Sequence, residues 1–128
     1  MSISETFYNY INTNFTSTNG VFYLINDNEV KAPYAVISLI DDPQETLSLC
    51  ATDQGQSRFQ MDIYEIASKI KNGNDKREDL KAVVRGLIAQ TISGYKFINV
   101  QAINSADRQG TEGNLIQYSF EALVEWEQ

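Results

Sequence analysis

Residues 58–64 alternate between apolar and polar side chains, as in a strand with one buried face. One side of this strand would carry Phe59, Met61 and Ile63. The other side would carry Arg58, Gln60, Asp62 and Tyr64. Further along, apolar residues recur at spacings of three and four, as on one face of a helix: Leu80, Val83, Val84, Leu87 and Ile88. A two-residue period followed by a helical period predicts a sheet with a helix packed on it.

A first helix is predicted near the start of the chain. Its apolar face would consist of Ile3, Phe7, Tyr10, Ile11 and Phe15. Ser2 and Glu5 have the spacing of a capping box at its beginning. Polar residues 16–20 end the helix, and the Asn19-Gly20 pair would turn the chain into a short strand at 21–25.

A second strand is expected at residues 34–40. Pro33 can open a strand where its missing amide donor is tolerated, and the residues that follow are apolar enough to be buried on both faces. The Asp41-Asp42-Pro43 sequence would end this strand. Residues 44–57 are polar apart from Leu47 and Leu49, which suggests a long hairpin connection with an extended strand arm.

The second half of the chain predicts one helix and two strands. Acidic residues Asp75, Glu78 and Asp79 are expected in the first turn of the helix, where they suit its dipole, and Gly94 is expected to end it. The lysine-rich residues 67–74 before it have no clear pattern. Strands are predicted at 95–104 and 115–127, joined by a polar loop, 105–113, with a mobile tip. The core face of the last strand would carry Ile116, Tyr118, Phe120, Ala122, Val124 and Trp126.

The order of these elements lacks the regular strand and helix alternation of a parallel sheet. We therefore expect an α+β fold, with a four- or five-stranded, mostly antiparallel sheet and two helices packed on one face. Residues 1–128 are expected to form one domain, because no repeat or low-complexity linker divides them.

Charge and hydropathy narrow the possible functions. The chain has 17 acidic and 10 basic residues and a formal charge of −7, which argues against broad binding to nucleic acid phosphates. Its apolar runs are far shorter than the roughly 20 residues needed to span a bilayer, so no membrane association is expected. No signal-peptide pattern opens the chain, which favours residence in a cytoplasm.

Catalytic chemistry finds little support in the sequence. There is no histidine, and Cys50 is the only cysteine, which excludes histidine triads and zinc sites of the histidine or multi-cysteine type within one chain. The Asp41-Asp42 pair is interpreted as a turn, and the Glu78-Asp79 pair as charges at a helix start. A cation at Asp27 or Asp41-Asp42 would lack calcium-loop spacing. We therefore predict no catalytic, cofactor-binding or metal-binding residues.

Two further groups of residues are candidates for binding surfaces. Basic residues cluster around the start of the second helix: Lys69, Lys71, Lys76, Arg77 and Lys81. Acids lie among them, so solvated surface charge is favoured over a phosphate-binding patch. Tyr64 and Tyr118 are predicted to be the exposed aromatic residues, suited either to stacking on bases or to an interface between proteins.

Three segments carry a resemblance to a known family. Residues 32–38 contain a Pro-Tyr pair entering a strand, residues 57–64 contain a Gln-x-Asp-x-Tyr strand, and residues 120–126 end a strand in tryptophan. With the amphipathic helix between them, they resemble tail terminator proteins, also called tail completion proteins, of lambda-like long-tailed phages. The resemblance covers most of the chain. Residues 67–74 depart from the family pattern, because they place more residues between the strand at 57–64 and the amphipathic helix than the family leads us to expect.

The resemblance implies a structural protein of the virion and no reaction. Such a protein forms a hexameric ring that caps the tail tube, stops its polymerisation and offers a surface for head attachment. Its partners would be the tail tube protein and a head-completion or neck protein, assembled in the host cytoplasm. DNA would pass through the lumen without specific binding, and the charge of −7 is consistent with this because carboxylates repel phosphates.

Candidate contacts to a neighbouring subunit or to the tube come from the polar strand face and from the loops 44–57 and 105–113. They are Arg58, Gln60, Asp62, Tyr64, Asp107, Arg108 and Glu112. Solvated surface charge is the alternative interpretation of these residues. Two alternatives for function also stay open: another neck component, such as a head-completion or head-to-tail joining protein, and a small acidic ligand-binding domain or enzyme.

Overall fold

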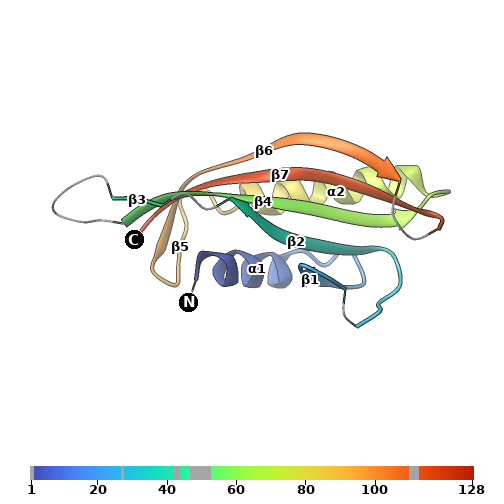
Figure 1. Ribbon diagram of the computed structural model, residues 1–128, viewed down its shortest axis with the longest axis horizontal. Coiled ribbons are helices and arrows are strands. Elements are labelled where there is room, and N and C mark those ends of the chain that lie inside the picture. The colour runs from blue at the N-terminus through green and yellow to red at the C-terminus, as the bar shows by residue number, and fades with distance from the viewer. Residues whose placement is uncertain (1, 27, 42–43, 47–52, 110–112) are drawn as a thin grey trace.

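The computed structural model describes residues 2–26, 28–41, 44–46, 53–109 and 113–128. The helices are α1 (Ile3–Asn14) and α2 (Ile70–Arg85). The strands are β1 (Val21–Tyr23), β2 (Tyr34–Asp41), β3 (Gln44–Thr46), β4 (Asp53–Ile66), β5 (Thr91–Ile92), β6 (Tyr95–Gln109) and β7 (Leu115–Glu127). Figure 1 shows that β4, β6 and β7 run nearly the length of the molecule.

All the described strands belong to one sheet of seven strands, in the order β1-β2-β4-β7-β6-β5, with β3 paired to the beginning of β4. The expected count of four or five was too low, because β3 and β5 are too short to leave a pattern in the sequence. Every pairing is antiparallel except that of β1 with β2. The parallel pair arises because residues 24–33 lead the chain back to the end of the sheet where β1 began.

Both helices cover the same face of the sheet, as predicted. Phe7 of α1 stacks on Phe59 of β4, with ring centroids 4.1 Å apart. Leu80 and Val84 of α2 are completely buried in the same core. The side of β4 predicted to face inward is confirmed, and so is the core face of β7, on which Ile116 is partly buried. Both helices thus contribute to one core on this face of the sheet.

Helix α1 begins as the sequence predicts. The Ser2 side chain accepts a hydrogen bond from the Glu5 backbone N–H (3.1 Å), which satisfies one of the free donors of the first turn. The Tyr8 hydroxyl donates to the Val21 carbonyl (2.8 Å), and the Tyr10 hydroxyl donates to the Val83 carbonyl of α2 (3.2 Å). These bonds tie α1 to β1 and to the other helix.

Helix α2 begins earlier than expected, at Ile70 within the lysine-rich stretch, so its first turn contains no acidic residue. The expected position of the acids in the first turn was therefore wrong. Gly73 lies in this first turn and is buried against the ring of Tyr118, and a glycine lets the helix approach β7 this closely. Gly86, not Gly94, caps the end of the helix.

The hairpin of β6 and β7 is longer than predicted. Residues 105–109 were expected in a loop but continue β6, where Asp107 pairs in register with Tyr118 and Gln109 with Ile116. The strand accommodates them with irregularities between Phe97 and Asn99 and between Ile103 and Ala106. Most of the predicted loop tip, residues 110–112, lies outside the described residues.

Replacing Gly73 with alanine tests how closely α2 approaches the sheet. An alanine Cβ would lie 2.2 Å from Cε2 of Tyr118, so the helix or the ring must shift. We expect Gly73→Ala to lower the free energy of unfolding by about 1–3 kcal/mol, as overpacking usually does. Helix propensity alone predicts the opposite sign, a gain of about 1 kcal/mol. Urea denaturation separates the two, with Asn72→Ala, an exposed change in the same helix, as the control.

Candidate interaction surfaces

The sheet face opposite the helices, here called the open face, carries the polar side of β4. Arg58, Gln60, Asp62 and Tyr64 all lie on it, in register with alternate residues of β7. Their neighbours there are Leu123, Glu121, Ser119 and Gln117. The predicted division of β4 into a core side and an outward side is therefore confirmed. No helix among the described residues covers this face (Figure 1).

Side chains of the open face already interact with one another. Arg58 Nε lies 3.6 Å from a carboxylate oxygen of Glu121, and Gln60 Nε2 donates to Oδ1 of Asp62 at 2.8 Å. Asp62 is only 8% exposed, so it has little surface to offer another molecule. The ring of Tyr64 stacks on that of Tyr34, with centroids 5.0 Å apart. Arg58, whose side chain is 44% exposed, remains the most accessible of the four predicted residues.

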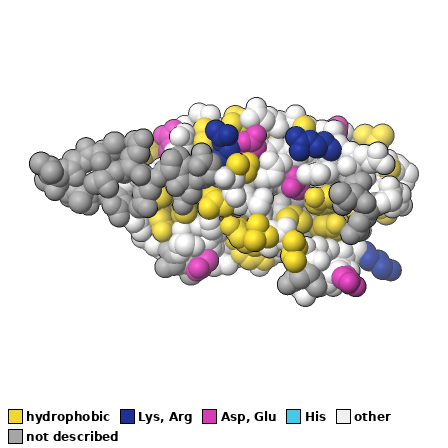
Figure 2. All heavy atoms as spheres, in the orientation of Figure 1, with side chains coloured by type: hydrophobic (Ala, Val, Ile, Leu, Met, Phe, Trp, Pro, Cys, Tyr) yellow, Lys and Arg dark blue, Asp and Glu magenta, His cyan; other side chains and the backbone are white. Residues whose placement is uncertain are grey.

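The open face is not uniformly polar. Figure 2 views it and shows charged side chains over one part and hydrophobic side chains over another. A second hydrophobic cluster, separate from the main core, is built on Tyr34, Val36 and Leu115. Phe22, Ala32, Tyr64 and Ile66 pack against it. This apolar part lies where β1, β2 and the ends of β4 and β7 meet.

A groove of about 920 Å³ lies over this second cluster. Tyr34, Val36 and Leu115 line it, and the connection from β1 to β2 forms a wall that includes Leu24 and Ile25. Both residues were predicted to belong to the first strand, but that strand ends at Tyr23. The sequence signal was misleading here, because an apolar run such as residues 21–25 is typical of a buried strand.

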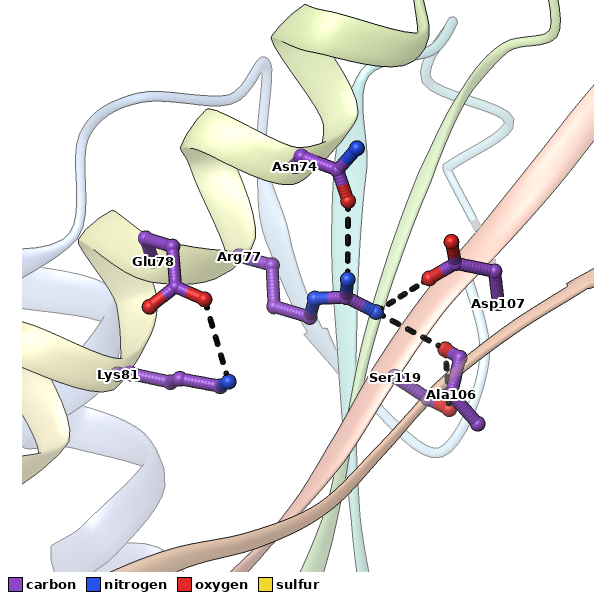
Figure 3. Close-up of polar contacts among 7 residues, drawn as sticks. All are labelled: Asn74, Arg77, Glu78, Lys81, Ala106, Asp107 and Ser119. Atoms are coloured by element: carbon purple, nitrogen blue, oxygen red, sulfur yellow. Dashed lines mark hydrogen bonds and ion pairs between the residues drawn. The ribbon is translucent and has the colours of Figure 1, made fainter.

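The hairpin of β6 and β7 is fastened to α2 by Arg77 (Figure 3). The guanidinium of Arg77 forms an ion pair with Asp107 and donates to the Ala106 carbonyl (3.1 Å) and to the Asn74 side-chain carbonyl (2.9 Å). The Ser119 hydroxyl donates to the same Ala106 carbonyl (3.2 Å). Asp107, predicted to pair with another subunit, thus has a partner within its own chain, although its side chain is 52% exposed.

Tyr118 lies directly beneath this ion pair. The Arg77 guanidinium carbon is 5.6 Å from the centroid of its ring, and the residue is only 1% exposed. The prediction that Tyr118 is an exposed aromatic residue was wrong, because its position in β7 places it on the core face opposite Ile63. Burial raises the pKa of Tyr118, and the nearby charges of Asp107 and Glu65 raise it further, while Arg77 lowers it.

Basic residues of α2 pack against the sheet more than their predicted solvation implied. The side chains of Lys76, Arg77 and Lys81 are only 20%, 12% and 12% exposed. Lys81 lies 3.3 Å from Glu78 and 5.7 Å from the centroid of the Phe120 ring, and Lys76 lies 4.0 Å from the buried Glu65. Long aliphatic stems let such side chains cover apolar surface while their charges are paired. Lys69 and Lys71 are exposed, as predicted.

The remaining predicted residues are less constrained. Arg108 is exposed on β6 and lies in register with Gln117, on the open face. Glu112, together with Asp27 and Asp42, lies outside the described residues. Across the described ranges, no cluster of three or more histidine, cysteine or acidic side chains is placed to hold a metal ion. None of the described helices has the length and apolarity needed to cross a membrane.

Comparisons with known proteins find similarity of fold. No protein-family model matches the sequence, and no curated protein matches it. Among solved structures, a chain from the virion of a native gene transfer agent particle superimposes with a TM-score of 0.64. The match covers 84% of this chain and 78% of that chain, at 10% sequence identity. At this identity the comparison shows a shared fold alone.

Removal of the Arg77 side chain tests whether the ion pair fastens the hairpin to α2. Arg77→Ala loses the bonds to Asp107, the Ala106 carbonyl and Asn74, so we expect it to destabilise the protein by about 2 kcal/mol. Hydrogen exchange of residues 105–109 should rise as well. Lys71→Ala, an exposed change in the same helix, is the control. Equal stability of the two variants would contradict the fastening role.

Titration at high pH tests the environment of Tyr118. Absorbance at alkaline pH should show one of the seven tyrosines ionising above the usual range, and Tyr118→Phe should remove this late step. The pKa of Tyr118 is higher in the folded state than in the unfolded state, so its protonated form contributes to the free energy of unfolding. This contribution is fully present below about pH 10, the unfolded-state pKa, and is lost as the pH rises through the folded-state pKa. A late step that survives in Tyr118→Phe would assign it to another tyrosine.

Proposed function

We propose that this chain is a structural subunit of a phage-like virion and acts as a tail terminator. Its fold is shared over 84% of its length with a chain of the gene transfer agent virion. This observation carries the proposal, and the Pro-Tyr and Gln-x-Asp-x-Tyr strands support the finer assignment by their resemblance to tail terminators. The subunits form a hexameric ring in the neck of the tail, assembled in the host cytoplasm.

The ring works by binding and not by catalysis. It caps the growing tube, blocks the addition of further tube protein, and offers its other side to a head-completion or neck protein. A ring suits this task because a contact between two different surfaces of one chain closes after a fixed number of subunits and then stops growing. The absence of histidine and the mutual pairing of Gln60 with Asp62 and of Arg58 with Glu121 are in keeping with a structural role.

Accessible polar residues supply the contacts of this ring. These residues are Arg58 and Arg108 on the open face and Asp107 on the hairpin of β6 and β7. They contact a neighbouring subunit, the tube or the lumen. Arg77 holds Asp107 in place before assembly, so little conformational freedom remains to be lost there on binding. The net charge of −7 lets DNA pass through the lumen without being retained, since acidic side chains repel phosphates.

Mass measurement of the purified protein, alone and with its tube protein, tests the proposal. For the protein alone we expect the mass of a hexamer. With the tube protein we expect hexameric rings at one end of each tube, and tubes that stop lengthening once the protein is added. Arg58→Glu should weaken ring assembly while leaving thermal stability nearly unchanged, because the side chain is 44% exposed. Lys71→Glu, a charge reversal on α2, is the matched control.

A chain that stays monomeric and never stops tube growth would contradict the terminator function. Rings that bind a portal or head-completion protein, and not tubes, would instead assign the chain to another neck component. That outcome would keep the virion role and correct the position in the particle.

A further inference from the structure

A second cleft, of about 350 Å³, lies between the start of α1 and the end of β1. Its lining consists of Ser2, Ser4, Glu5, Tyr8 and Tyr23. Two of these side chains are aromatic, one is acidic and none is basic. Such a lining suits a cation, because the faces of aromatic rings and a carboxylate both attract positive charge.

The two tyrosine rings of the cleft meet at a right angle. The centroids of the Tyr8 and Tyr23 rings are 6.3 Å apart, and the angle between the ring planes is 82°. In the corner between two such rings, one cation can contact a face of each. The Tyr8 hydroxyl donates to the Val21 carbonyl (2.8 Å), and Tyr23 pairs in register with Ile37 of β2. The corner is therefore held by the sheet before any ligand binds, which lowers the entropic cost of binding.

Glu5 supplies the negative charge of the cleft. Its side chain is exposed, and no lysine or arginine of the described residues forms an ion pair with it. The Glu5 N–H donates to the Ser2 hydroxyl (3.1 Å) and the Thr6 N–H donates to the Ser2 carbonyl (3.0 Å), so these donors at the positive end of α1 are already bonded. The carboxylate is thus free to pair with a cation from another molecule.

A suitable cation lies on the opposite side of the sheet. Figure 1 shows α1 and β1 along one long side of the molecule and β6 along the other, where only the short β5 follows it in the strand order. Strand β6 has two basic residues. Lys96 lies 3.7 Å from Glu127, whereas Arg108 is exposed and forms no ion pair with a described residue. A guanidinium fits this cleft better than an ammonium group, because it can stack on a ring while donating two hydrogen bonds to a carboxylate.

We propose that the cleft formed by Glu5, Tyr8 and Tyr23 of one copy of this chain binds Arg108 of a second copy. The contact joins two different surfaces on opposite sides of the molecule, so each subunit gives one arginine and receives another. Repetition of this contact produces a ring when the rotation between subunits closes. The inference rests on the proposed function, because it specifies which two surfaces of the chain form the ring.

Charge reversal tests the contact directly. Glu5→Arg should repel Arg108 of the neighbouring copy, and Arg108→Glu should repel Glu5. Each variant alone should therefore assemble at least about tenfold more weakly than the wild type. Mixed in equal amounts, the two variants should form rings again, because subunits that alternate around a hexamer then place opposite charges at every contact. Native mass spectrometry should find equal numbers of the two variants in each ring.

Matched variants control for effects on folding. Lys71→Glu and Asp75→Arg reverse exposed charges on α2, and each should form rings unaided. Tyr23→Leu removes one ring of the corner and should weaken assembly about threefold, the usual contribution of a cation–π contact at an exposed site. Tyr23→Phe retains the ring and should assemble like the wild type. Thermal unfolding of each variant checks that the folded state is retained.

The outcomes separate this inference from the proposed function. Normal rings from Glu5→Arg alone and from Arg108→Glu alone would overturn the inference and leave the terminator function standing. Folded variants whose mixture still fails to assemble would also overturn it. So would a Glu5→Arg variant that forms rings but no longer binds tubes, because a cation of the tube protein would then be the occupant. A wild-type chain that remains monomeric, with and without tube protein, would overturn both.

Discussion

Strands β4 and β7 pair antiparallel from Gln54–Glu127 to Ile66–Leu115, and both helices pack on one side of this pair. Because side chains alternate along a strand, each apolar residue placed beneath the helices leaves its neighbour on the open face. Burial of one side of each strand therefore determines which residues lie on the open face. The contact between Phe7 and Phe59 and the burial of Tyr118 beneath α2 belong to this single constraint. The composition of each outward surface therefore depends on which residues of the same strand are buried beneath the helices.

Ion pairing completes what apolar burial begins. Lys76, Arg77 and Lys81 of α2 lie close to the sheet, where Arg77 forms an ion pair with Asp107 and Lys76 lies 4.0 Å from Glu65. The Arg77–Asp107 pair fastens the long hairpin of β6 and β7 to α2 at a point far along its length, and the Lys76–Glu65 pair joins α2 to β4. A two-stranded hairpin held in this way can present a fixed surface to a partner, which an unsupported hairpin would do only at a cost in entropy.

The open face combines two kinds of surface that would serve the proposed assembly differently. Its charged part, with Arg58 and Glu121 paired, favours orientation and selectivity over affinity. Its apolar part, the groove beside Leu24, supplies area that can be removed from water. The proposed ring would need both, because each interface must be strong enough to form and specific enough to close at the right number of subunits.

Local periodicity was enough to predict α1, the alternation of β4 and β7, and the placement of both helices on one face, since these depend on which side of an element is apolar. Contacts between distant residues decided the rest. Helix α2 lies close to β7 because Gly73 fits against Tyr118, and β6 continues to Gln109 because its polar residues find partners on α2 and β7. The groove has the same origin: an apolar run that is typical of a strand is turned outward at Leu24. The sequence by itself determined the two faces of α1, β4 and β7, whereas the lengths of the elements, the pairing of β1 and the groove were decided by tertiary structure, because their free energy comes from residues far apart in the chain.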